Sequence, residues 1–503
     1  MKKIKIMFTS DIHGHFYPTD YLDSKKKPAG LFHIAQEFHK DENTLILDGG
    51  DILQGSPFAY YSQMTKNPEA AAELMNEAGY DVVTIGNHDF NYGDSYLLSY
   101  LNKLNACCVC QNCVEKGSGK ILFPWKIFQM QNGIRVGVIG AVTDFVNVWE
   151  KEENLSEVKI LDVYNSILKA FREMKNQVDF SVCLYHGGME CDMETGRVLE
   201  KTGENIGFQI CRELGFDLLL TGHQHMPIHG QMLNNTYVVQ NACNAGTCHE
   251  IQVVFENDNI QIESRMIAAA EIPMRDSRLP LQAMEDNVQD WLDSIVGHLQ
   301  KPLLPKGHLQ MALEGTKLAE FINKAQMAYT GAEISCTSLA NQVSGLPKDV
   351  RVRDVLLTYP FPNTLVILEI TGCVLQKALE RTAEYFEIID GEIQIAKSFL
   401  KPKVEHYNFD FYYGITYDIA YDAPVGNRIS NIRVRGKSLE SGKYYQICMN
   451  NYRASGAGGY EMYVGCKIIK HFTKDIFEIL LEYIGNEKTG NESGGGAVQY
   501  PSV

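Results

Sequence analysis

Short runs of consecutive apolar residues, each ending in a cluster of polar residues, recur through the first half of the chain. They lie at residues 4–8, 44–47, 82–85, 136–139, 180–184 and 218–220. Unbroken apolar runs of this length are typical of strands that are buried on both faces, as in parallel sheets covered by helices. The pattern therefore predicts an α/β layered architecture for the first half of the chain.

Helix signals lie between these apolar runs. Asn67 and Pro68 form a start signal, because Asn favours the N-cap and Pro the first turn, and Gly79 is a stop signal. A second helix is expected over residues 203–214. Residues 237–266 then read as strands, because their apolar positions are short and rich in Val and Ile.

The second half of the chain has a different pattern. Residues 282–299 have helical spacing, and Pro302 and Pro305 end this predicted connecting helix. Beyond it, helices and strands mix without the earlier alternation. The expected helices are 317–329 and 374–385, and the expected strands are 365–370, 413–419, 429–434 and 444–449. A smaller α+β domain is therefore expected here.

The length of 503 residues also predicts more than one domain, at about 150 residues per domain. We expect a first domain at 1–270, a linker with a helix at 271–306 and a second domain at 307–485. The Gly- and Ser-rich segment 486–503 lacks periodicity and is expected to be a flexible tail.

The charge balance narrows the range of partners. The chain has 62 acidic and 46 basic residues, a formal net charge of −16. Nucleic acid polymers and anionic membrane surfaces both reward clustered Lys and Arg, so neither is expected as a partner. An anionic substrate would need a local positive group, such as a bound metal ion.

The N-terminus and the cysteines indicate the compartment. The apolar run at 4–8 is too short for a signal-peptide core, and no stretch approaches the roughly 18 apolar residues of a membrane span. Thirteen Cys, an odd number, fit a reducing compartment. As written, the chain is expected to be cytoplasmic, and export of a longer precursor stays open.

Four cysteines gather at 107, 108, 110 and 113, and two interpretations apply to them. Cys110-x-x-Cys113 could form a thiolate metal site, or residues 106–114 could be a strand whose small apolar side chains are thiols. Closed thiolate sites usually draw on two such pairs, and no second pair lies nearby. The strand is the favoured interpretation.

Residues with metal-binding side chains follow nearly every predicted strand of the first half. The clusters are Asp11-x-His13, Gly49-Gly50-Asp51, Asn87-His88-Asp89, His186-Gly187-Gly188 and His223-x-His225. Each cluster alone is weak, since an Asp-x-His is more often a capped turn than a ligand pair. Ligands of α/β sheets bind beyond the carboxyl ends of the strands, so all five clusters can converge on one rim.

The chemistry of these clusters suggests the metal and the reaction. Carboxylate, imidazole and amide oxygen together suit Mn, Zn, Fe or Co. More than four candidate ligands imply two ions, which one carboxylate could bridge. Two adjacent metal ions are the usual device for in-line displacement at phosphate esters, so hydrolysis at phosphorus is predicted.

The order D-x-H, G-D, G-N-H-D, H-G-G, G-H-x-H resembles the signature of the calcineurin-like metallophosphoesterases over residues 4–266. The resemblance implies a four-layer α/β/β/α sandwich with a dinuclear metal site. By motif, one ion would be held by Asp11, His13 and His225, the other by Asn87, His186 and His223, with Asp51 bridging. His88 would be the non-ligand catalytic His that stabilises or protonates the leaving oxygen.

Residues 307–480 resemble the C-terminal domain of the 5′-nucleotidase family, which supplies nucleoside specificity. The resemblance rests on the motifs at 359–365, 369–372 and 450–456. Some positions depart from plain 5′-nucleotidases. Asn91 stands where they place an acidic partner for the catalytic His, residues 338–342 replace their phosphate-region motif, and Gly458 replaces a common Asp.

The motifs at 407–410 and 450–454 are instead similar to the 2′,3′-cyclic-nucleotide 2′-phosphodiesterase/3′-nucleotidase branch. In that branch two Tyr sandwich the base, which makes Tyr407 and Tyr452 the candidates here. Phe409 and Asn341 are further substrate-binding candidates, although Phe409 could equally be a buried strand residue.

The expected function is therefore hydrolysis of a small nucleotide phosphate ester by a hydroxide that bridges two divalent ions. The favoured activity is that of a 2′,3′-cyclic-nucleotide 2′-phosphodiesterase/3′-nucleotidase, with Asp51 and His88 as catalytic residues. The alternatives are a 5′-nucleotidase or nucleotide-sugar hydrolase on the same scaffold and a binding protein that has lost the chemistry. The native metal, the base and the oligomeric state stay open.

Overall fold

The computed structural model describes residues 1–199, 203–256, 259–275, 279–361, 363–401 and 404–486. The chain divides into two compact units, Met1–Gln289 and Asp290–Val503. Residues 487–503 of the predicted flexible tail, and Pro362 of the 359–365 motif, lie outside the described residues. None of the described helices combines the length and apolar composition needed to cross a bilayer.

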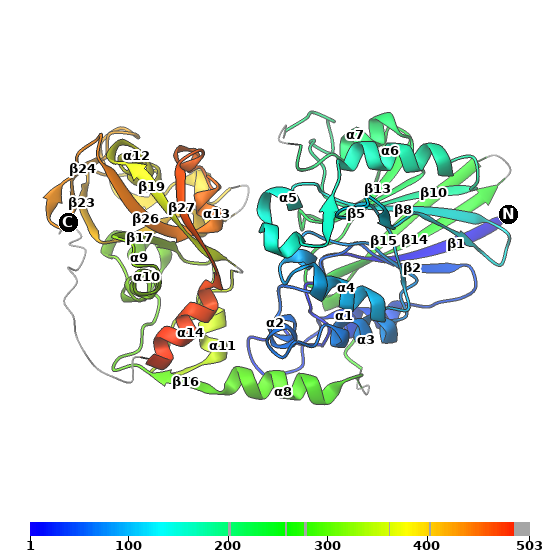
Figure 1. Ribbon diagram of the computed structural model, residues 1–503, viewed down its shortest axis with the longest axis horizontal. Coiled ribbons are helices and arrows are strands. Elements are labelled where there is room, and N and C mark those ends of the chain that lie inside the picture. Colours follow the sequence, from blue (N-terminus) through cyan, green and yellow to red (C-terminus); the bar gives the residue numbers. More distant parts are fainter. Residues whose placement is uncertain (200–202, 257–258, 276–278, 362, 402–403, 487–503) are drawn as a thin grey trace. The chain divides into compact units, whose positions relative to one another are not determined.

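The first unit contains two six-stranded sheets (Figure 1). The first sheet has the order β15-β14-β1-β2-β3-β4, and its parallel part consists of β1 (Lys2–Thr9), β2 (Thr44–Asp48), β3 (Val82–Val83) and β4 (Cys107–Cys108). The second has the order β12-β13-β11-β10-β8-β7, and its parallel part consists of β8 (Arg135–Val142), β10 (Phe180–His186), β11 (Leu218–Thr221) and β13 (Thr236–Gln240). Antiparallel strands complete both sheets: β14 (Thr247–Glu256), β15 (Asn259–Ala268), β7 (Lys126–Gln129) and β12 (Ile228–Leu233).

The two sheets pack face to face around one apolar core. Alternate residues of β1, such as Ile6 and Phe8, share this core with Val136 and Val138 of β8 and Val182 of β10. Each such side chain contributes about 1.5–3 kcal/mol on burial. The apolar runs predicted from the sequence are therefore the inner strands of a sandwich.

Helices cover the outer faces of the sandwich (Figure 1). Apolar residues of α6 (Val163–Met174) and α7 (Gly207–Glu213) form a second core with the outward side chains of β8, β10 and β11. On the opposite side lie α1 (Leu31–Ile34), α3 (Glu69–Ala78) and α4 (Asp94–Lys103). The predicted α/β/β/α order is confirmed.

Two helix starts were predicted wrongly. The N-cap of α3 is Pro68 rather than Asn67, and no side chain caps it, while Gly79 ends the helix with φ 82° as expected. The helix predicted over 203–214 begins only at Gly207. Asn205, which lies just before this helix, is bonded to another loop, because its side-chain oxygen accepts a 2.7 Å hydrogen bond from the backbone N–H of Gly188.

The predicted strand at 106–114 is divided between two sheets. β4 belongs to the first large sheet, whereas β5 (Cys110–Glu115) lies in a three-stranded sheet with β6 (Ile121–Phe123) and β9 (Val158–Ile160). Among the described residues, the groups able to hold a metal ion include no cysteine of this segment. Cys107 and Cys108 are therefore strand residues of β4, and Cys110 and Cys113 are strand residues of β5.

The second unit is built on a five-stranded sheet of order β22-β17-β26-β19-β27. Its strands are β17 (Ile334–Ser338), β19 (Thr364–Thr371), β22 (Asp410–Tyr413), β26 (Tyr444–Asn450) and β27 (Lys467–Asp475). The main helices are α10 (Lys317–Thr330), α12 (Gly372–Ala383) and α14 (Ile476–Asn486). Leu375 and Leu379 of α12 pack on Val366 and Leu368 of β19, which confirms the mixed α+β class.

The strand predicted over 413–419 is broken at Gly414, whose φ is 86°. A Cβ atom there would lie 2.4 Å from the carbonyl oxygen of Glu333, so only glycine allows the close approach. β22 ends before this break, and β23 (Ile415–Ile419) joins a separate sheet with β24 (Ile429–Val434) and β25 (Lys437–Ser438).

The helix predicted over 282–299 was too long. α8 (Gln282–Asp293) ends earlier, and β16 (Ile295–His298) pairs with β18 (Asp349–Arg351), more than fifty positions further along the chain. This long-range pairing overrides the local periodicity.

The shorter elements are α2 (Pro57–Met64), α5 (Val146–Trp149), α9 (His308–Glu314), α11 (Val352–Thr358), α13 (Asn451–Ala454) and the hairpin of β20 (Phe386–Ile389) and β21 (Glu392–Ile395).

Candidate metal centre

The predicted ligands follow the carboxyl ends of strands from both sheets of the first unit. β1 leads into Asp11 and His13, β2 into Asp51, β3 into Asn87, β10 ends at His186, and β11 leads into His223 and His225. Parallel strands place these ends on one rim of the sandwich. The structure brings all seven residues together there.

Five of the seven residues have the left-handed backbone conformation that L-residues rarely adopt. Their φ angles are 55° for Asp11, 50° for His13, 60° for Asp51, 70° for His223 and 57° for His225. Each such residue costs about 1–3 kcal/mol, and such strain concentrates at functional sites. Hydrogen bonds between the loops stabilise this strained backbone conformation, including one of 2.8 Å from the backbone N–H of His13 to the carbonyl of Asp51.

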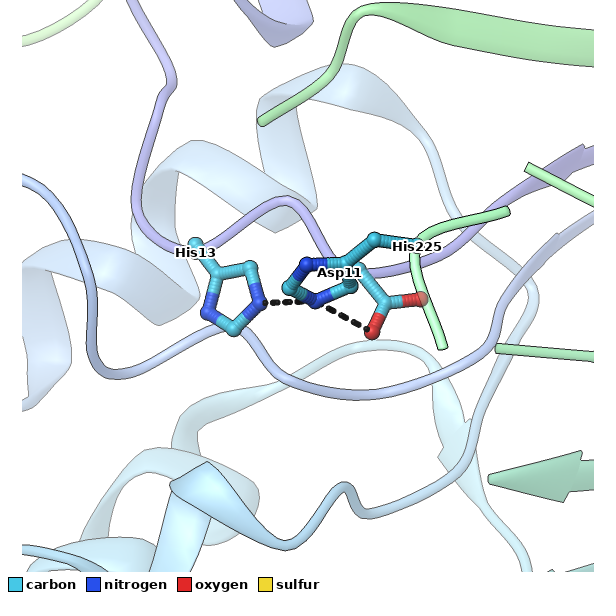
Figure 2. A group of neighbouring side chains, drawn as sticks. All are labelled: Asp11, His13 and His225. Carbon is cyan, nitrogen blue, oxygen red and sulfur yellow. Dashed lines mark hydrogen bonds and ion pairs between the residues drawn. The ribbon is translucent and has the colours of Figure 1, made fainter. Parts of the chain in front are cut away.

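Asp11, His13 and His225 form the first ligand group (Figure 2). Nε2 of His13 lies 3.0 Å from Nε2 of His225, which in turn lies 3.4 Å from Oδ1 of Asp11. Nδ1 of His13 donates a 2.8 Å hydrogen bond to the carbonyl of Gln54. A neutral His13 therefore has its lone pair on Nε2, toward the other two side chains.

Asn87, His186 and His223, which were predicted to hold the other ion, also lie together, and we call them the second ligand group. Oδ1 of Asn87 lies 3.1 Å from Nε2 of His186 and 2.8 Å from Nδ1 of His223. His186 donates from Nδ1 to the carbonyl of Gly49 over 2.6 Å, so its lone pair also points inward when the ring is neutral.

Asp51 links the two groups. Its Oδ2 lies 3.2 Å from Nε2 of His186 and 3.8 Å from Nε2 of His13. The residue is fully buried, and Oδ2 accepts no hydrogen bond from the described part of the chain. A buried carboxylate oxygen without a donor, facing imidazole nitrogens, is an arrangement that divalent cations satisfy. The residues present therefore fit bound metal ions, and Asp51 faces both groups.

The pKa values of the two carboxylates match this role. Burial alone would raise the pKa of Asp51, but the neighbouring His186 and His88 outweigh burial and hold that pKa well below its ordinary value. The pKa of Asp11 is lowered in the same way, chiefly by its hydrogen bond with His225. Both carboxylates are therefore ionised, the state in which they bind a metal ion.

The histidines separate into two kinds. Burial lowers the pKa of His13 to about 4, which leaves it neutral at pH 7. Burial opposes a charge on His186 and His225 as well, but Asp51 and Asp11 raise the pKa of each to about 10. Metal ions compete with protons for such nitrogens, so metal binding at these two residues would release protons.

His88 lies beside both groups without belonging to either. Its ring centroid is 5.4 Å from that of His13, and its backbone N–H donates a 2.8 Å hydrogen bond to Oδ1 of Asp51. Nδ1 of His88 lies 2.8 Å from Oδ1 of Asn91, whose amide nitrogen donates to Glu150. Nδ1 of His88 therefore reaches a carboxylate, that of Glu150, only through the side chain of Asn91.

Sequence reasoning missed three residues of this site. Glu150 fastens Asn91, Glu204 accepts a 2.9 Å hydrogen bond from Nε2 of His223, and Trp149 stacks on the His223 ring. None of them belongs to a motif or directly follows a parallel strand, so no local signal could have identified them.

In the second unit, Arg453 contacts both Tyr407 and Tyr452. Arg453 is 1% exposed, and its Nε lies 2.9 Å from Oδ2 of the buried Asp410. Its Nη2 donates a 3.0 Å hydrogen bond to the backbone carbonyl of Tyr407, and its guanidinium lies 5.8 Å from the centre of the Tyr452 ring. Tyr452, on α13, is 43% exposed. One buried cation thus fixes the backbone near both aromatic rings.

The other two substrate-binding candidates, Phe409 and Asn341, contact other residues of the second unit. Phe409 is buried, with its ring centroid 4.8 Å from that of Tyr385 and 4.9 Å from that of Phe411. The side-chain amide of Asn341 donates to the carbonyl of Val404 and accepts from the N–H of His406, over 2.7 and 2.9 Å. Their predicted contact with substrate stays a prediction.

Close contacts explain why position 458 is a glycine. Its φ is 72°, and a Cβ atom there would lie 2.1 Å from Oδ1 of Asn408 and 2.4 Å from Nη1 of Arg453. Any side chain at this position would require the Asn408 amide and the Arg453 guanidinium to move.

The fold and the clustered Asp, His and Asn ligands define a metal-dependent phosphoester hydrolase. Residues 4–227 match the calcineurin-like phosphoesterase family, and residues 295–465 match the 5′-nucleotidase C-terminal domain family. A crystal structure of a candidate 5′-nucleotidase from Staphylococcus aureus, in complex with alpha-ketoglutarate, is 31% identical; the match covers 96% of this chain and 97% of that one, with a TM-score of 0.86. The protein belongs to the calcineurin-like phosphoesterases that carry a 5′-nucleotidase C-terminal domain.

Curated relatives have several nucleotide activities in their names. A 2′,3′-cyclic-nucleotide 2′-phosphodiesterase/3′-nucleotidase from Salmonella typhimurium is 26% identical, and the match covers 90% of this chain and 81% of that protein. The trifunctional nucleotide phosphoesterase protein YfkN from Bacillus subtilis is 25% identical. The match covers 97% of this chain, which spans 38% of the length of YfkN.

Proposed function

We propose that the protein hydrolyses 2′,3′-cyclic nucleotides and 3′-nucleotides with two divalent ions of Mn, Zn, Fe or Co. The observation that carries this proposal is that Arg453 contacts both Tyr407 and Tyr452, which lie in the two segments similar to the cyclic-phosphodiesterase branch. The name of the Salmonella typhimurium relative supports it.

Each ligand group has a stated task in this proposal. Asp11, His13 and His225 hold one ion, Asn87, His186 and His223 hold the other, and Asp51 is shared between them. When bound, the two ions would supply positive charge for the phosphate oxygens and an activated water for in-line attack at phosphorus.

His88 supplies a proton to the leaving oxygen. The carboxylate of Glu150 accepts from the amide N–H of Asn91, so the oxygen of Asn91 faces Nδ1 of His88 and accepts from it. Nδ1 is therefore protonated, and Nε2 is the nitrogen that exchanges a proton with substrate. As the P–O2′ bond of the cyclic ester breaks, His88, protonated on both ring nitrogens for this step, donates the Nε2 proton to O2′; the product is a 3′-nucleotide, and the ring keeps its Nδ1–H.

A substrate panel tests the proposal. The enzyme is stripped with EDTA, individual metals are restored, and turnover of 2′,3′-cyclic AMP, 3′-AMP, 5′-AMP and a nucleotide sugar is measured. We expect loss of activity with EDTA, recovery with a divalent metal, and preference for the first two substrates.

The second candidate is a 5′-nucleotidase or nucleotide-sugar hydrolase, which the name of the Staphylococcus aureus structure favours. Preference for 5′-AMP or for the nucleotide sugar would replace the proposed activity with this one. No turnover of any substrate with any metal would instead indicate a binding protein that has lost the chemistry.

Removing the ring of Tyr452 should weaken nucleotide binding. Base stacking on an aromatic ring is worth about 1–3 kcal/mol, so Tyr452→Ala is expected to raise KM for nucleotides by about 5- to 150-fold. KM for p-nitrophenyl phosphate, which has no base, should not change. Tyr444→Ala is the matched control, because Tyr444 is a 65% exposed tyrosine of the same unit. An unchanged nucleotide KM in Tyr452→Ala would rule out stacking on this ring.

A further inference from the structure

His223 uses both of its ring nitrogens. Nδ1 lies 2.8 Å from Oδ1 of Asn87, inside the second ligand group, and Nε2 lies 2.9 Å from Oε1 of Glu204. A carboxylate accepts hydrogen bonds, so the Nε2–H of His223 donates to Glu204. In a neutral imidazole the lone pair is then on Nδ1, the nitrogen that faces the other ligands.

Glu204 is held next to the ligand loops by its backbone. Its carbonyl accepts hydrogen bonds from Oγ1 of Thr143 over 2.8 Å and from the Tyr185 hydroxyl over 3.3 Å. The next residue, Asn205, accepts from the backbone N–H of Gly188, which follows the ligand His186 in the H-G-G turn. The carboxylate therefore comes from a segment that is bonded to the same rim of the sandwich.

The ring of His223 is also restrained on one face. Trp149, at the end of α5, stacks on it with ring centroids 5.5 Å apart and planes 25° apart. Trp149 and Glu204 approach the ring from segments more than fifty positions apart in the chain. The orientation of His223 is thus set by two residues outside the ligand motifs.

We propose that Glu204 is a positioning residue of the metal centre that fixes the tautomer and orientation of His223 and so retains the ion of the second group. The proposal rests on the proposed metal centre. Metal-binding imidazoles commonly donate their other N–H to a carboxylate or carbonyl, and loss of that partner weakens metal binding.

The charges of the two groups explain why a carboxylate is used here. The first group includes the carboxylate of Asp11, whereas Asn87, His186 and His223 bring no negative charge of their own. His13 and His186 donate their outer N–H to the backbone carbonyls of Gln54 and Gly49. Glu204 gives the second group the additional negative charge, because its carboxylate bonds to His223.

Metal binding to purified protein tests this role without relying on activity. Wild type, Glu204→Gln and Glu204→Ala are stripped with a chelator and titrated with Mn²⁺ by calorimetry. We expect two sites in the wild type. In both variants one site should weaken by about 10- to 100-fold while the other keeps its affinity. Glu194→Gln is the matched control, an exposed glutamate of the same connecting segment, and should bind as wild type.

A double substitution identifies the site that is affected. His223→Ala should remove or weaken the same site, and Glu204→Gln should cause no further loss in that background. Circular dichroism of the metal-free proteins checks that the variants fold. Should a variant be unfolded, Glu204→Asp, which keeps the charge but shortens the reach, is expected to weaken the same site.

The outcomes separate the two proposals. A wild type that binds none of Mn²⁺, Zn²⁺, Fe²⁺ and Co²⁺ in the same titration contradicts the metal centre itself, and this inference with it. A wild type with two sites and Glu204 variants with unchanged affinities would overturn the role of Glu204 alone. Equal weakening of both sites, or additive losses in the double variant, would also overturn it.

Discussion

Asp51→Asn is expected to lower kcat for phosphoester hydrolysis by about a thousandfold or more. The electrostatic contribution of catalytic metal ions is worth several kcal/mol, and about 4 kcal/mol corresponds to a factor of a thousand. Oδ2 of Asp51 lies 3.2 Å from Nε2 of His186 and 3.8 Å from Nε2 of His13, so it faces one imidazole of each ligand group.

The amide of the variant cannot replace that oxygen. Oδ1 of Asp51 accepts from the backbone N–H of His88, so an Asn would keep its oxygen there and turn its NH₂ group toward the imidazoles. Two N–H donors would then occupy the place of the shared negative charge. The backbone tolerates the change, because Asn adopts a φ near 60° more readily than most residues.

Metal content and kcat measured on the same preparation check this prediction. We expect loss of metal stoichiometry together with the loss of turnover. Asp179→Asn is the control, since Asp179 is a half-exposed surface residue that pairs with Arg135. Near wild-type turnover in Asp51→Asn with two bound metals would exclude Asp51 as the shared ligand.

The sandwich could be predicted because its inner strands are buried on both faces. The runs at 4–8, 136–139 and 180–184 lie within β1, β8 and β10, and each strand extends further than its apolar run. The failures have a common cause in long-range pairing. β16 pairs with β18, and the strand expected over 413–419 is split by the contact of Gly414 with Glu333. Neither partner can be read from local periodicity.

The clustering of the candidate ligands could be predicted because topology places the ends of parallel strands on one rim. A residue directly after β1 or β11 reaches that rim whatever the intervening sequence. Glu150 and Glu204 lie in connecting segments, and they reach their partners across 59 and 19 positions of the chain. Their side chains acquire a role only when the segments fold against the sandwich, so their types alone carry no signal.

His88→Asn is expected to lower kcat for 2′,3′-cyclic AMP and 3′-AMP by about 10²- to 10⁴-fold, the usual contribution of a general acid. His88 belongs to neither ligand group, so metal content should remain that of the wild type. The Asn keeps the backbone N–H that bonds to Asp51, and that hydrogen bond should persist in the variant. The loss would therefore come from the imidazole itself.

The leaving group distinguishes protonation from binding. A ribose oxygen is a poor leaving group without a proton, whereas p-nitrophenolate departs without one. His88→Asn should therefore lose much less turnover on p-nitrophenyl phosphate than on nucleotides, and His39→Asn, an exposed histidine of the same unit, should lose none on either. An equal loss on both esters would assign His88 to holding the phosphate rather than to protonating the leaving oxygen. Full turnover in His88→Asn would show that His88 has no part in the reaction. The hydrogen bonds from His88 through Asn91 to Glu150 would then serve only to stabilise the loop.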